Sequence, residues 1–458
     1  MARNREMNMT EGPLLKKIIL YALPLVATNV LQMLFHAADV ITLRFFAGEG
    51  PVAAVGGTAA LINLIVGLFV GLSVGANVSV ARAVGEGKEE TAHKIVGTSV
   101  IISVLMGFVL SFVGFFGART FLTWMGCDEN VIGMATTYMR IYFLGLPVVM
   151  LYNFCASILR AVGDTVRPLI YLIVSGVVNV GLNITMITVF HLDVEGVAIA
   201  TITSQAICAV LALIALSRSK GYARLRKQFF RIHLPELKEM TRIGLPSGLQ
   251  GTVFSLSNVV IQSAIFSFGE PAMAGNALAS QYDNFIFMVT NAIALSTVAF
   301  VSQNRGAGQY DRIRKTVRYS LYLAIGTGVL MGIVLFLFSD LYCDLMVESE
   351  AARYYAMMRV TVLTTTYFLC GIQDVMSNAM RGLGKSSLAM FISIVGTCVV
   401  RIIWINTVFR IPTFHSILTV YISYPISWLV TILLYLVLYF PTIRKTKAEI
   451  EASLPNLA

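Results

Sequence analysis

Polar residues recur every three or four positions along the first long apolar stretch of the chain, at Asn29, Gln32, His36 and Asp39. In a helix this spacing places all four on one face. A carboxylate at the centre of a membrane helix costs about 2.5–3.5 kcal/mol, and such residues typically mark ion or substrate pathways. Asp39 is therefore expected to face a cavity or a partner, unless it is a structural aspartate near the outer surface. His36 is either a proton carrier near neutral pH or a packed, neutral histidine.

A second polar pair lies further along the chain, where Asn179 and Asn183 are four residues apart and share a helix face. Thr201 and Thr203 follow in the next apolar stretch and offer hydroxyl oxygens. These threonines are either cation ligands or partners in hydrogen bonds between helices.

The second half of the chain has its own charged residues within apolar stretches. Asp374 lies in "GIQDVMSNAM" and Arg401 in "VVRIIWI". Because an unpaired arginine between apolar neighbours is costly, we expect a structural ion pair between Arg401 and Asp374. Asp283, in "ASQYDNFIFM", either attracts a cationic substrate or completes a local polar network.

Methionine and aromatic side chains are plentiful, and most of them must pack in the core or face lipid. A few could line an adaptable substrate cavity, because flexible methionine-rich surfaces suit promiscuous binding. Besides Asp283 and Asp374, the candidates for this cavity are Met33, Phe35, Tyr142, Tyr282, Phe287 and Met288.

Composition places the chain outside the class of soluble proteins. Of its 458 residues 57% are hydrophobic and 13% charged, and the mean hydropathy is +0.78, whereas soluble domains carry about 25% charged residues. Apolar runs of about 20 residues, enough to cross a bilayer core of roughly 30 Å, recur throughout. The predicted fold class is an all-α polytopic membrane protein with a retained first helix and no cleavable signal peptide.

Hydrophobic runs and helix breakers predict twelve transmembrane helices. Of the 34 Lys and Arg residues, 27 fall in segments that are cytoplasmic if the N-terminus is inside, and only four fall in outer loops. The positive-inside rule then places both termini in the cytoplasm. The net charge of +10 thus belongs to loops beside the membrane, and no nucleic-acid partner is expected. The expected spans are 14–43, 52–81, 94–117, 133–159, 168–190, 195–217, 239–268, 271–303, 316–339, 352–380, 387–410 and 415–441.

The two halves of the chain repeat each other at a nearly constant offset. Pro24 corresponds to Pro246, 222 residues later, and Gly163 corresponds to Gly384 at an offset of 221. Six helices per half give both halves the same topology, so the repeat is parallel and suits alternating access between two bundles. We expect an N-terminal lobe (1–217), a cytoplasmic linker (218–238), a C-terminal lobe (239–441) and a cytoplasmic tail (442–458), with the lobes related by pseudo-two-fold symmetry.

Several motifs together resemble the multidrug and toxic compound extrusion (MATE) transporters, on their DinF-like branch. The resemblance covers nearly the whole chain and implies twelve helices in two lobes around a central cavity. It implies antiport of amphipathic, often cationic compounds against H+ or Na+. The motifs are Pro24, the spacing from Gln32 to Asp39, "AVG" (54–56), "ARAVGEGK" (81–88), "YMRIYFLGLP" (138–147), "ILRAVGDTVRP" (158–168), "GVAIATITSQ" (196–205) and "DNFIFM" (283–288).

The resemblance also implies roles for individual residues. Asp39 matches a first-helix aspartate that couples ion binding to drug release. We expect Gln32, His36, Asn179, Asn183 and Thr201 to lie around it, although His36 stands where the family more often has a polar amide. Some relatives have an aspartate where this chain has Asn183, so the site here holds one formal negative charge, which favours H+ over Na+ as the coupled ion. Relatives with ion coupling in the second lobe leave a coupling role open for Asp374.

Other classes of protein fit the sequence less well. A flippase for lipid-linked precursors, from the same wider superfamily, should have a strongly basic cavity. An intramembrane lipid-modifying enzyme should have clustered Asp, His or metal ligands, and none is found, so no enzymatic activity is expected. The six cysteines form no CxxC motif, and "GEGKEE" (85–90) lacks the spacing of a phosphate-binding loop. We expect no metal and no cofactor beyond the coupled ion, small-molecule substrates, and a monomer in the inner or plasma membrane.

Overall fold

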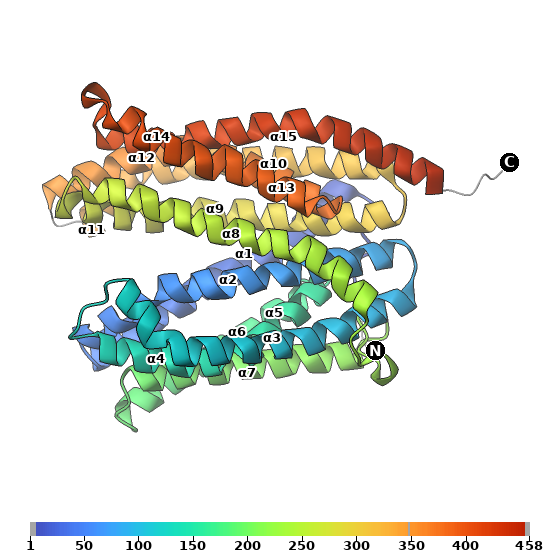
Figure 1. Cartoon of the computed structure of the whole chain (residues 1–458), viewed down its shortest axis with the longest axis horizontal. Coiled ribbons are helices and arrows are strands. Elements are labelled where there is room, and N and C mark those ends of the chain that lie inside the picture. Colours follow the sequence, from blue (N-terminus) through green and yellow to red (C-terminus); the bar gives the residue numbers. More distant parts are fainter. Residues whose placement is uncertain (1–5, 347–348, 454–458) are drawn as a thin grey trace. The chain divides into compact units, whose positions relative to one another are not determined.

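The structure of the chain is a computed structural model that describes residues 6–346 and 349–453. Within these residues the secondary structure is helical, and no strand occurs (Figure 1). The first half contains α1 (Leu14–Phe46), α2 (Glu49–Gly85), α3 (Glu89–Trp124), α4 (Ile132–Leu144), α5 (Leu146–Ala161), α6 (Val166–Thr188) and α7 (Val194–Arg218). The second half contains α8 (Leu234–Phe266), α9 (Glu270–Gly306), α10 (Tyr310–Leu337), α11 (Ser339–Met346), α12 (Glu350–Gly382), α13 (Ser386–Ser393), α14 (Val400–Asn406) and α15 (Ile417–Ser453).

Every expected transmembrane span corresponds to one or more of these helices. Ten described segments are long and apolar enough to cross a membrane, and the pair α4–α5, bent by 51°, makes an eleventh. The twelfth expected span corresponds to α12, which has 33 residues but is less apolar, because Arg359, Gln373 and Asp374 interrupt its apolar sequence. The last helix, α15, continues to Ser453, beyond the expected end of the twelfth span at residue 441.

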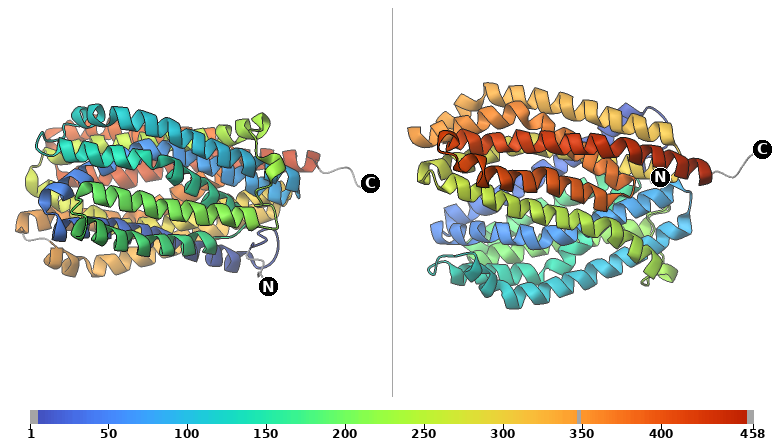
Figure 2. Two further views of the ribbon diagram at one scale, coloured as in Figure 1. Left: turned by 90° about the horizontal axis from the view of Figure 1, so that it is seen from below. Right: turned by 45° about the horizontal axis from the view of Figure 1, so that its top comes forward.

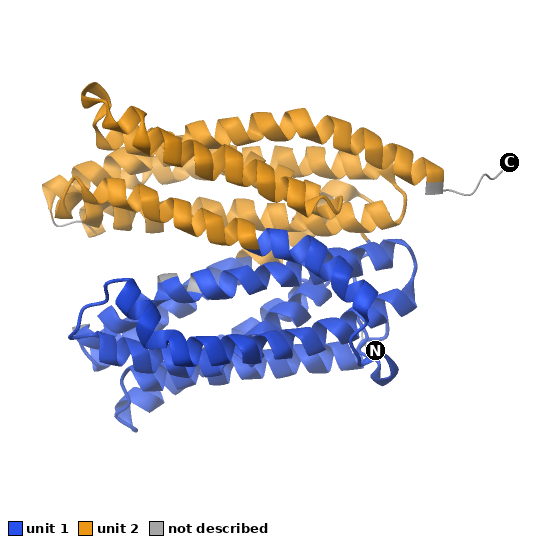
Figure 3. Ribbon diagram, in the orientation of Figure 1, with its two compact units in different colours: residues 1–8, 27–248 blue, residues 9–26, 249–458 orange. Residues whose placement is uncertain are grey.

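The chain divides into two compact units (Figure 3). Unit 1 consists of Met1–Asn8 and Ala27–Gly248, and unit 2 of Met9–Val26 and Leu249–Ala458. The units differ from the expected lobes in two segments. The first part of α1 belongs to unit 2, and the first part of α8 belongs to unit 1. Each of these segments ends two residues after a proline within its helix, Pro24 in α1 and Pro246 in α8.

Glycines allow the first part of α8 to pack closely in unit 1. A Cβ atom at Gly71 of α2 would collide with the backbone of Gly248, and one at Gly75 would collide with the carbonyl of Met240. Gly244 likewise lies against the backbone of Leu72. Small residues at such crossings let the backbones of membrane helices approach one another. The first part of α8 is therefore an integral part of the core of unit 1.

The first part of α1 is packed in unit 2 in the corresponding way. Ala22 belongs to a buried cluster with Ile293 and Ala294 of α9, and the rings of Tyr21 and Phe300 meet edge to face at 5.6 Å. Within unit 2, helices α9, α10, α12 and α15 run along one another (Figure 2). The core of each unit thus contains the first half of a helix whose second half belongs to the other unit.

The eleventh expected span is not a regular α-helix. A π-helical turn, η2 (Ile394–Val399), separates α13 from α14. A π-turn carries an extra residue, which rotates the residues that follow by about 100° relative to a continuous α-helix with 3.6 residues per turn. This rotation determines which neighbours Arg401 of α14 can reach.

Candidate functional site

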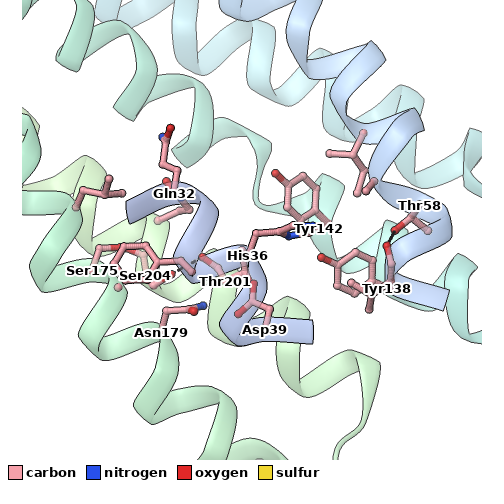
Figure 4. Close-up of a pocket in the computed structure, with 17 residues that line it drawn as sticks. Gln32, His36, Asp39, Thr58, Tyr138, Tyr142, Ser175, Asn179, Thr201 and Ser204 are labelled. Carbon is pink, nitrogen blue, oxygen red and sulfur yellow. Dashed lines mark hydrogen bonds between the residues drawn. The ribbon is translucent and has the colours of Figure 1, made fainter. Parts of the chain in front are cut away.

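The polar residues of α1 line a cavity inside unit 1, which we call the first-unit cavity. Its volume is about 350 Å³. Figure 4 shows His36 and Asp39 on α1 with Tyr138 and Tyr142 on one side and Asn179 and Thr201 on the other. The cavity is lined by Gln32, Phe35, His36 and Asp39 of α1, Val55, Thr58, Ala59 and Ile62 of α2, Tyr138 and Tyr142 of α4, Leu172, Ser175, Gly176 and Asn179 of α6, and Thr201, Ser204 and Gln205 of α7.

Asp39 is held by Asn183 of α6, which is in turn bonded to Asn179. Its side chain is buried, with 8% of the residue exposed, and the Nδ2 atom of Asn183 donates a hydrogen bond of 2.5 Å to its Oδ1 atom. The same Nδ2 atom donates to Oδ1 of Asn179 at 3.3 Å. A carboxylate with a neutral donor and no cation beside it has an unbalanced charge when ionised. This arrangement suits a group that takes up H+ or a metal cation from the cavity.

Buried oxygen atoms without a hydrogen-bond partner lie on the residues around Asp39. In the part of the chain that the structure describes, these include Oδ1 of Asn183, Oγ1 of Thr201 and Oε1 of Gln205. Unpartnered buried acceptors are costly and need a donor, a water molecule or an ion. Thr201 and Gln205 line the cavity directly, whereas Asn183 supports Asp39 from behind the lining.

Aromatic rings form one wall of the first-unit cavity. Tyr138 and Tyr142 lie one turn apart on α4, and their rings stack with centroids 6.2 Å apart. Phe35 lies against Gly176 of α6, where any Cβ atom would collide with its ring. His36 is largely exposed to the cavity rather than packed in the core. A flat organic molecule could stack on this wall with its polar group toward Asp39.

The residues expected to line one substrate cavity are divided between two cavities. Phe35 and Tyr142 line the first-unit cavity, whereas Phe287 and Asp374 line a smaller one of about 160 Å³ inside unit 2. We call the smaller one the second-unit cavity. Four of the expected residues lie outside the lining of both cavities, namely Met33, Tyr282, Asp283 and Met288.

Tyr282 has a structural setting instead. Its ring stacks on Tyr342 with centroids 4.3 Å apart, and its hydroxyl donates to the carbonyl of Leu335 at 2.7 Å. Met288 is buried, with 8% of its surface exposed. Both side chains therefore contribute to the core of unit 2.

The expected ion pair between Arg401 and Asp374 is wrong. Among the described residues Arg401 has no carboxylate partner: its Nε donates to Ser427 at 2.9 Å, its Nη1 donates to Asn258 at 3.4 Å, and its guanidinium lies 4.3 Å from the ring centroid of Tyr424. The expectation assumed that only a carboxylate could compensate the buried charge, whereas here neutral polar groups and an aromatic ring surround it. The π-turn before α14 also rotates Arg401 relative to a continuous α-helix.

The ion pair that forms in unit 2 joins Asp283 to Arg359. Arg359 of α12 donates through Nε and Nη2 to Oδ2 of Asp283 on α9, at 3.0 and 2.9 Å. Its Nη1 also donates to Oδ1 of Asn276 at 2.6 Å. Of the two roles left open for Asp283, the local polar network is therefore the one that the structure supports. The sequence contained a signal for this pair, because Arg359 and Asp283 are both charged residues inside expected spans.

Several lining residues of the first-unit cavity escaped the sequence reasoning. Tyr138 lies four residues before Tyr142 and therefore on the same helix face, which was a usable signal. Ser175 and Ser204 gave none, because serine occurs throughout these helices; here the hydroxyl of Ser175 donates to the carbonyl of Ser204 at 2.7 Å. This bond joins α6 to α7 beside Asn179.

Comparison with known proteins agrees with this architecture. The MatE family model matches residues 24–185 and again 246–405, which confirms the internal repeat. The chain is 26% identical over 426 residues to the probable multidrug resistance protein YoeA of Bacillus subtilis, covering 92% of each chain. It is 23% identical to the probable multidrug resistance protein NorM of Thermotoga maritima over 84% of each chain.

A solved structure has the same fold. It is an outward-facing multidrug resistance MATE transporter of the MOP superfamily, with a TM-score of 0.89 and 20% sequence identity over 99% of this chain and 100% of that one. Together with the family match over more than half of the chain, these observations show that the chain belongs to the MATE family of multidrug efflux transporters.

Proposed function

We propose that this protein is a cation-coupled antiporter that exports amphipathic, often cationic compounds, with Asp39 as the coupling carboxylate. The observation that carries the proposal is the setting of Asp39, a buried carboxylate at a cavity, supported by Asn183 and without a cationic partner among the lining residues. An ion and a cationic substrate that compete for one carboxylate can be exchanged across the membrane by alternating access. The names of the relatives as multidrug resistance proteins support this substrate class.

We favour H+ as the coupled ion. Asp39 is the only acidic residue among those that line the first-unit cavity, and Asn183 presents an N–H donor to it rather than an oxygen. Protonation of Asp39 would remove the unbalanced charge without requiring further ligands.

Na+ is the second candidate, and the unpartnered oxygens of Asn183 and Thr201 favour it. Na+ needs several oxygen ligands, so the Asn183 amide would have to turn until Oδ1 rather than Nδ2 faces Asp39. Such a rotation would bring a second oxygen to the carboxylate.

The proposal is tested in proteoliposomes loaded with a fluorescent cationic dye. With a pH gradient alone, wild-type protein should drive dye transport, and Asp39→Asn should reduce the initial rate at least tenfold, because an amide cannot titrate. Asp193→Asn, which removes an exposed carboxylate at the start of α7, serves as the matched control and should leave the rate unchanged.

The identity of the ion follows from the same assay with one gradient at a time. H+ coupling predicts transport with a pH gradient alone, at a rate unaffected by Na+. Transport with a Na+ gradient alone would overturn the preference for H+, and undiminished gradient-driven transport by Asp39→Asn would overturn the role of Asp39.

The proposal also covers the membrane location, the oligomeric state and the orientation of the protein. We place it in the inner or plasma membrane, as a monomer, with both termini in the cytoplasm. The distribution of Lys and Arg supports this orientation, since 27 of 34 then lie in inner segments. Labelling of single cysteines at the two ends of the helices from outside intact cells would test it.

A further inference from the structure

The second-unit cavity has features that export of simple cations does not explain. It is enclosed by α8, α9, α12, η2, α14 and α15, with a volume of about 160 Å³. Aromatic rings form much of its wall, and two arginines and an aspartate open onto it. The lining consists of Phe254, Asn258, Phe287, Arg359, Leu363, Tyr367, Cys370, Gln373, Asp374, Thr397, Arg401, Tyr424 and Trp428.

Arg401 brings a buried positive charge that no carboxylate neutralises. The residue is 6% exposed, and its hydrogen-bond partners in the described part of the chain, Ser427 and Asn258, are both neutral. A guanidinium has five N–H donors, of which these contacts use two. Stacking on Tyr424 offsets only part of the cost of this buried charge. The unused donors are available to an anionic group in the cavity.

Asp374 brings the opposite charge to the same cavity. Among the described residues its carboxylate makes no hydrogen bond and no ion pair. The positive charge of Arg381, on the same helix, acts on this carboxylate, but the Arg381 guanidinium makes its hydrogen bonds to Gln250 at 2.9 Å and to Asn378 at 3.4 Å. Asp374 and Arg401 thus line one small cavity without pairing with each other.

One of the two arginines that line the cavity is already neutralised. Arg359 is paired with Asp283 at 2.9 Å, so the pair contributes no net charge. Among the lining residues, Arg401 and Asp374 then remain as one positive and one negative group that do not pair with each other, beside aromatic walls. An anion would leave the aspartate uncompensated, and a cation would leave the arginine uncompensated. A ligand with both charges can pair with both side chains.

We propose that the second-unit cavity is a binding site for a small aromatic zwitterion. The carboxylate of the ligand binds Arg401, its ammonium group binds Asp374, and its ring packs among Tyr367, Tyr424 and Trp428. This inference goes beyond the proposed coupling function, because it involves neither Asp39 nor the first-unit cavity.

Comparison of the two halves shows that the fold does not require these charges. At the offset of 221 residues, Arg401 corresponds to Val180 and Asp374 to Asn153. The π-turn at Ile394–Val399 has no counterpart either, since the corresponding part of α6 is regular α-helix. π-turns within helices occur frequently at functional sites. Here the π-turn carries Thr397 into the cavity wall, where it donates to Gln373 at 3.2 Å.

The test is direct binding to the purified full-length protein, read from the fluorescence of Trp428. The probes are phenylalanine, its methyl ester, which keeps only the ammonium group, and N-acetylphenylalanine, which keeps only the carboxylate. A second zwitterion, 4-(aminomethyl)benzoate, has more widely separated charges. At least one zwitterion should bind ten times or more tightly than either singly charged derivative of phenylalanine, and Trp428→Phe should abolish the signal.

Variants then assign the two charges. Arg401→Gln should lower the affinity for the zwitterion at least tenfold, to the level of the methyl ester. Asp374→Asn should lower it to the level of the N-acetyl derivative. Arg353→Gln is the matched control and should leave the affinity unchanged. It removes a charge near the start of α12, where Arg353 pairs with Asp340 and Asp344.

The outcomes separate this inference from the proposed function. Asp39→Asn should bind the zwitterion normally even though it fails to couple transport. Three results would each overturn the inference. The first is that neither zwitterion binds at 10 mM, and the second is that the zwitterions bind no more tightly than the singly charged derivatives. The third is that a folded Arg401→Gln protein binds the zwitterion as tightly as wild-type protein. The probe series on wild-type protein needs no variant, so the test stands even where a variant fails to fold.

Discussion

At the scale of single residues, the pair of Asp283 and Arg359 is the main buried ion pair of unit 2. We expect Arg359→Ala to destabilise the protein by about 3–5 kcal/mol, because it leaves Asp283 buried and unpaired. The double variant Asp283→Leu/Arg359→Met, which removes both charges, should recover most of this loss. Thermal unfolding of the purified protein measures both effects.

Arg353→Ala is the control for this prediction, because its ion pairs with Asp340 and Asp344 are exposed. Exposed pairs contribute about 0–1 kcal/mol, so its unfolding temperature should change little. A double variant as unstable as Arg359→Ala would show that packing rather than charge dominates at this position.

Glu6 predicts a local dependence on pH outside the membrane-spanning helices. Burial raises the pKa of this carboxyl, partly offset by the hydrogen bond that Ser219 donates to it at 3.2 Å. Because burial is the larger effect, the buried position of Glu6 is most stable when its carboxyl is protonated, at pH below the ordinary pKa of glutamate. This stability is lost as the pH rises through the raised pKa.

We therefore expect amides near Glu6 and Ser219 to be better protected from hydrogen exchange at acidic than at neutral pH, after correction for intrinsic rates. Glu6→Gln should remove the dependence, and the exposed Glu11→Gln should not. Equal protection of wild-type protein at both pH values would contradict the prediction.

Sequence reasoning reached some of these residues and not others. The helical spacing of Gln32, His36 and Asp39 was enough to place them on one cavity wall, and the spacing of Asn179 and Asn183 correctly indicated a shared face. The partner of Arg401 could not be predicted, because it depends on a π-turn that local propensities do not reveal. The pairing of Asp283 with Arg359 depends on which helices pack together, which the pattern of one chain does not specify.

At the scale of helices, the crossing of α2 and the first part of α8 depends on glycine. Gly71→Leu should prevent this crossing, because even a Cβ atom collides with the backbone of Gly248. We expect at least a tenfold loss of monodisperse protein in size-exclusion chromatography. Gly67→Leu is the matched control on α2, since its Cβ would meet nothing within 4 Å. A normal yield of Gly71→Leu protein would contradict the tight packing of these helices.

The helices themselves were largely predictable, since long apolar runs leave few alternatives in a bilayer. The fourth expected span, 133–159, nevertheless divides into α4 and α5 with a bend of 51°. The bend lies where Gly145 precedes Pro147, a combination that weakens helical continuity. This break was visible in the sequence, whereas the π-turn of the eleventh span was not.

At the scale of the whole molecule, the exchange of half-helices makes the two units dependent on each other. If the chain is cut between Lys220 and Gly221, each fragment carries a half-helix that packs in the other unit. We expect each fragment alone to be degraded or aggregated, and the two together to assemble. Co-purification through a tag on one fragment, followed by size-exclusion chromatography, measures this; a well-folded single fragment would contradict it.

The exchange of half-helices between the units also bears on the evolutionary origin of the chain. Two similar six-helix proteins that trade the first halves of their first helices form a domain-swapped dimer, and joining them through one linker gives the connectivity seen here. One traded segment runs from Met9 to Val26, and the other ends at Gly248. Each ends two residues after a proline, Pro24 or Pro246. In such a fused chain neither half could be lost, because each supplies a segment that packs in the other unit. The cavities of the two halves nevertheless differ, since one holds Asp39 and the other holds Arg401 and Asp374.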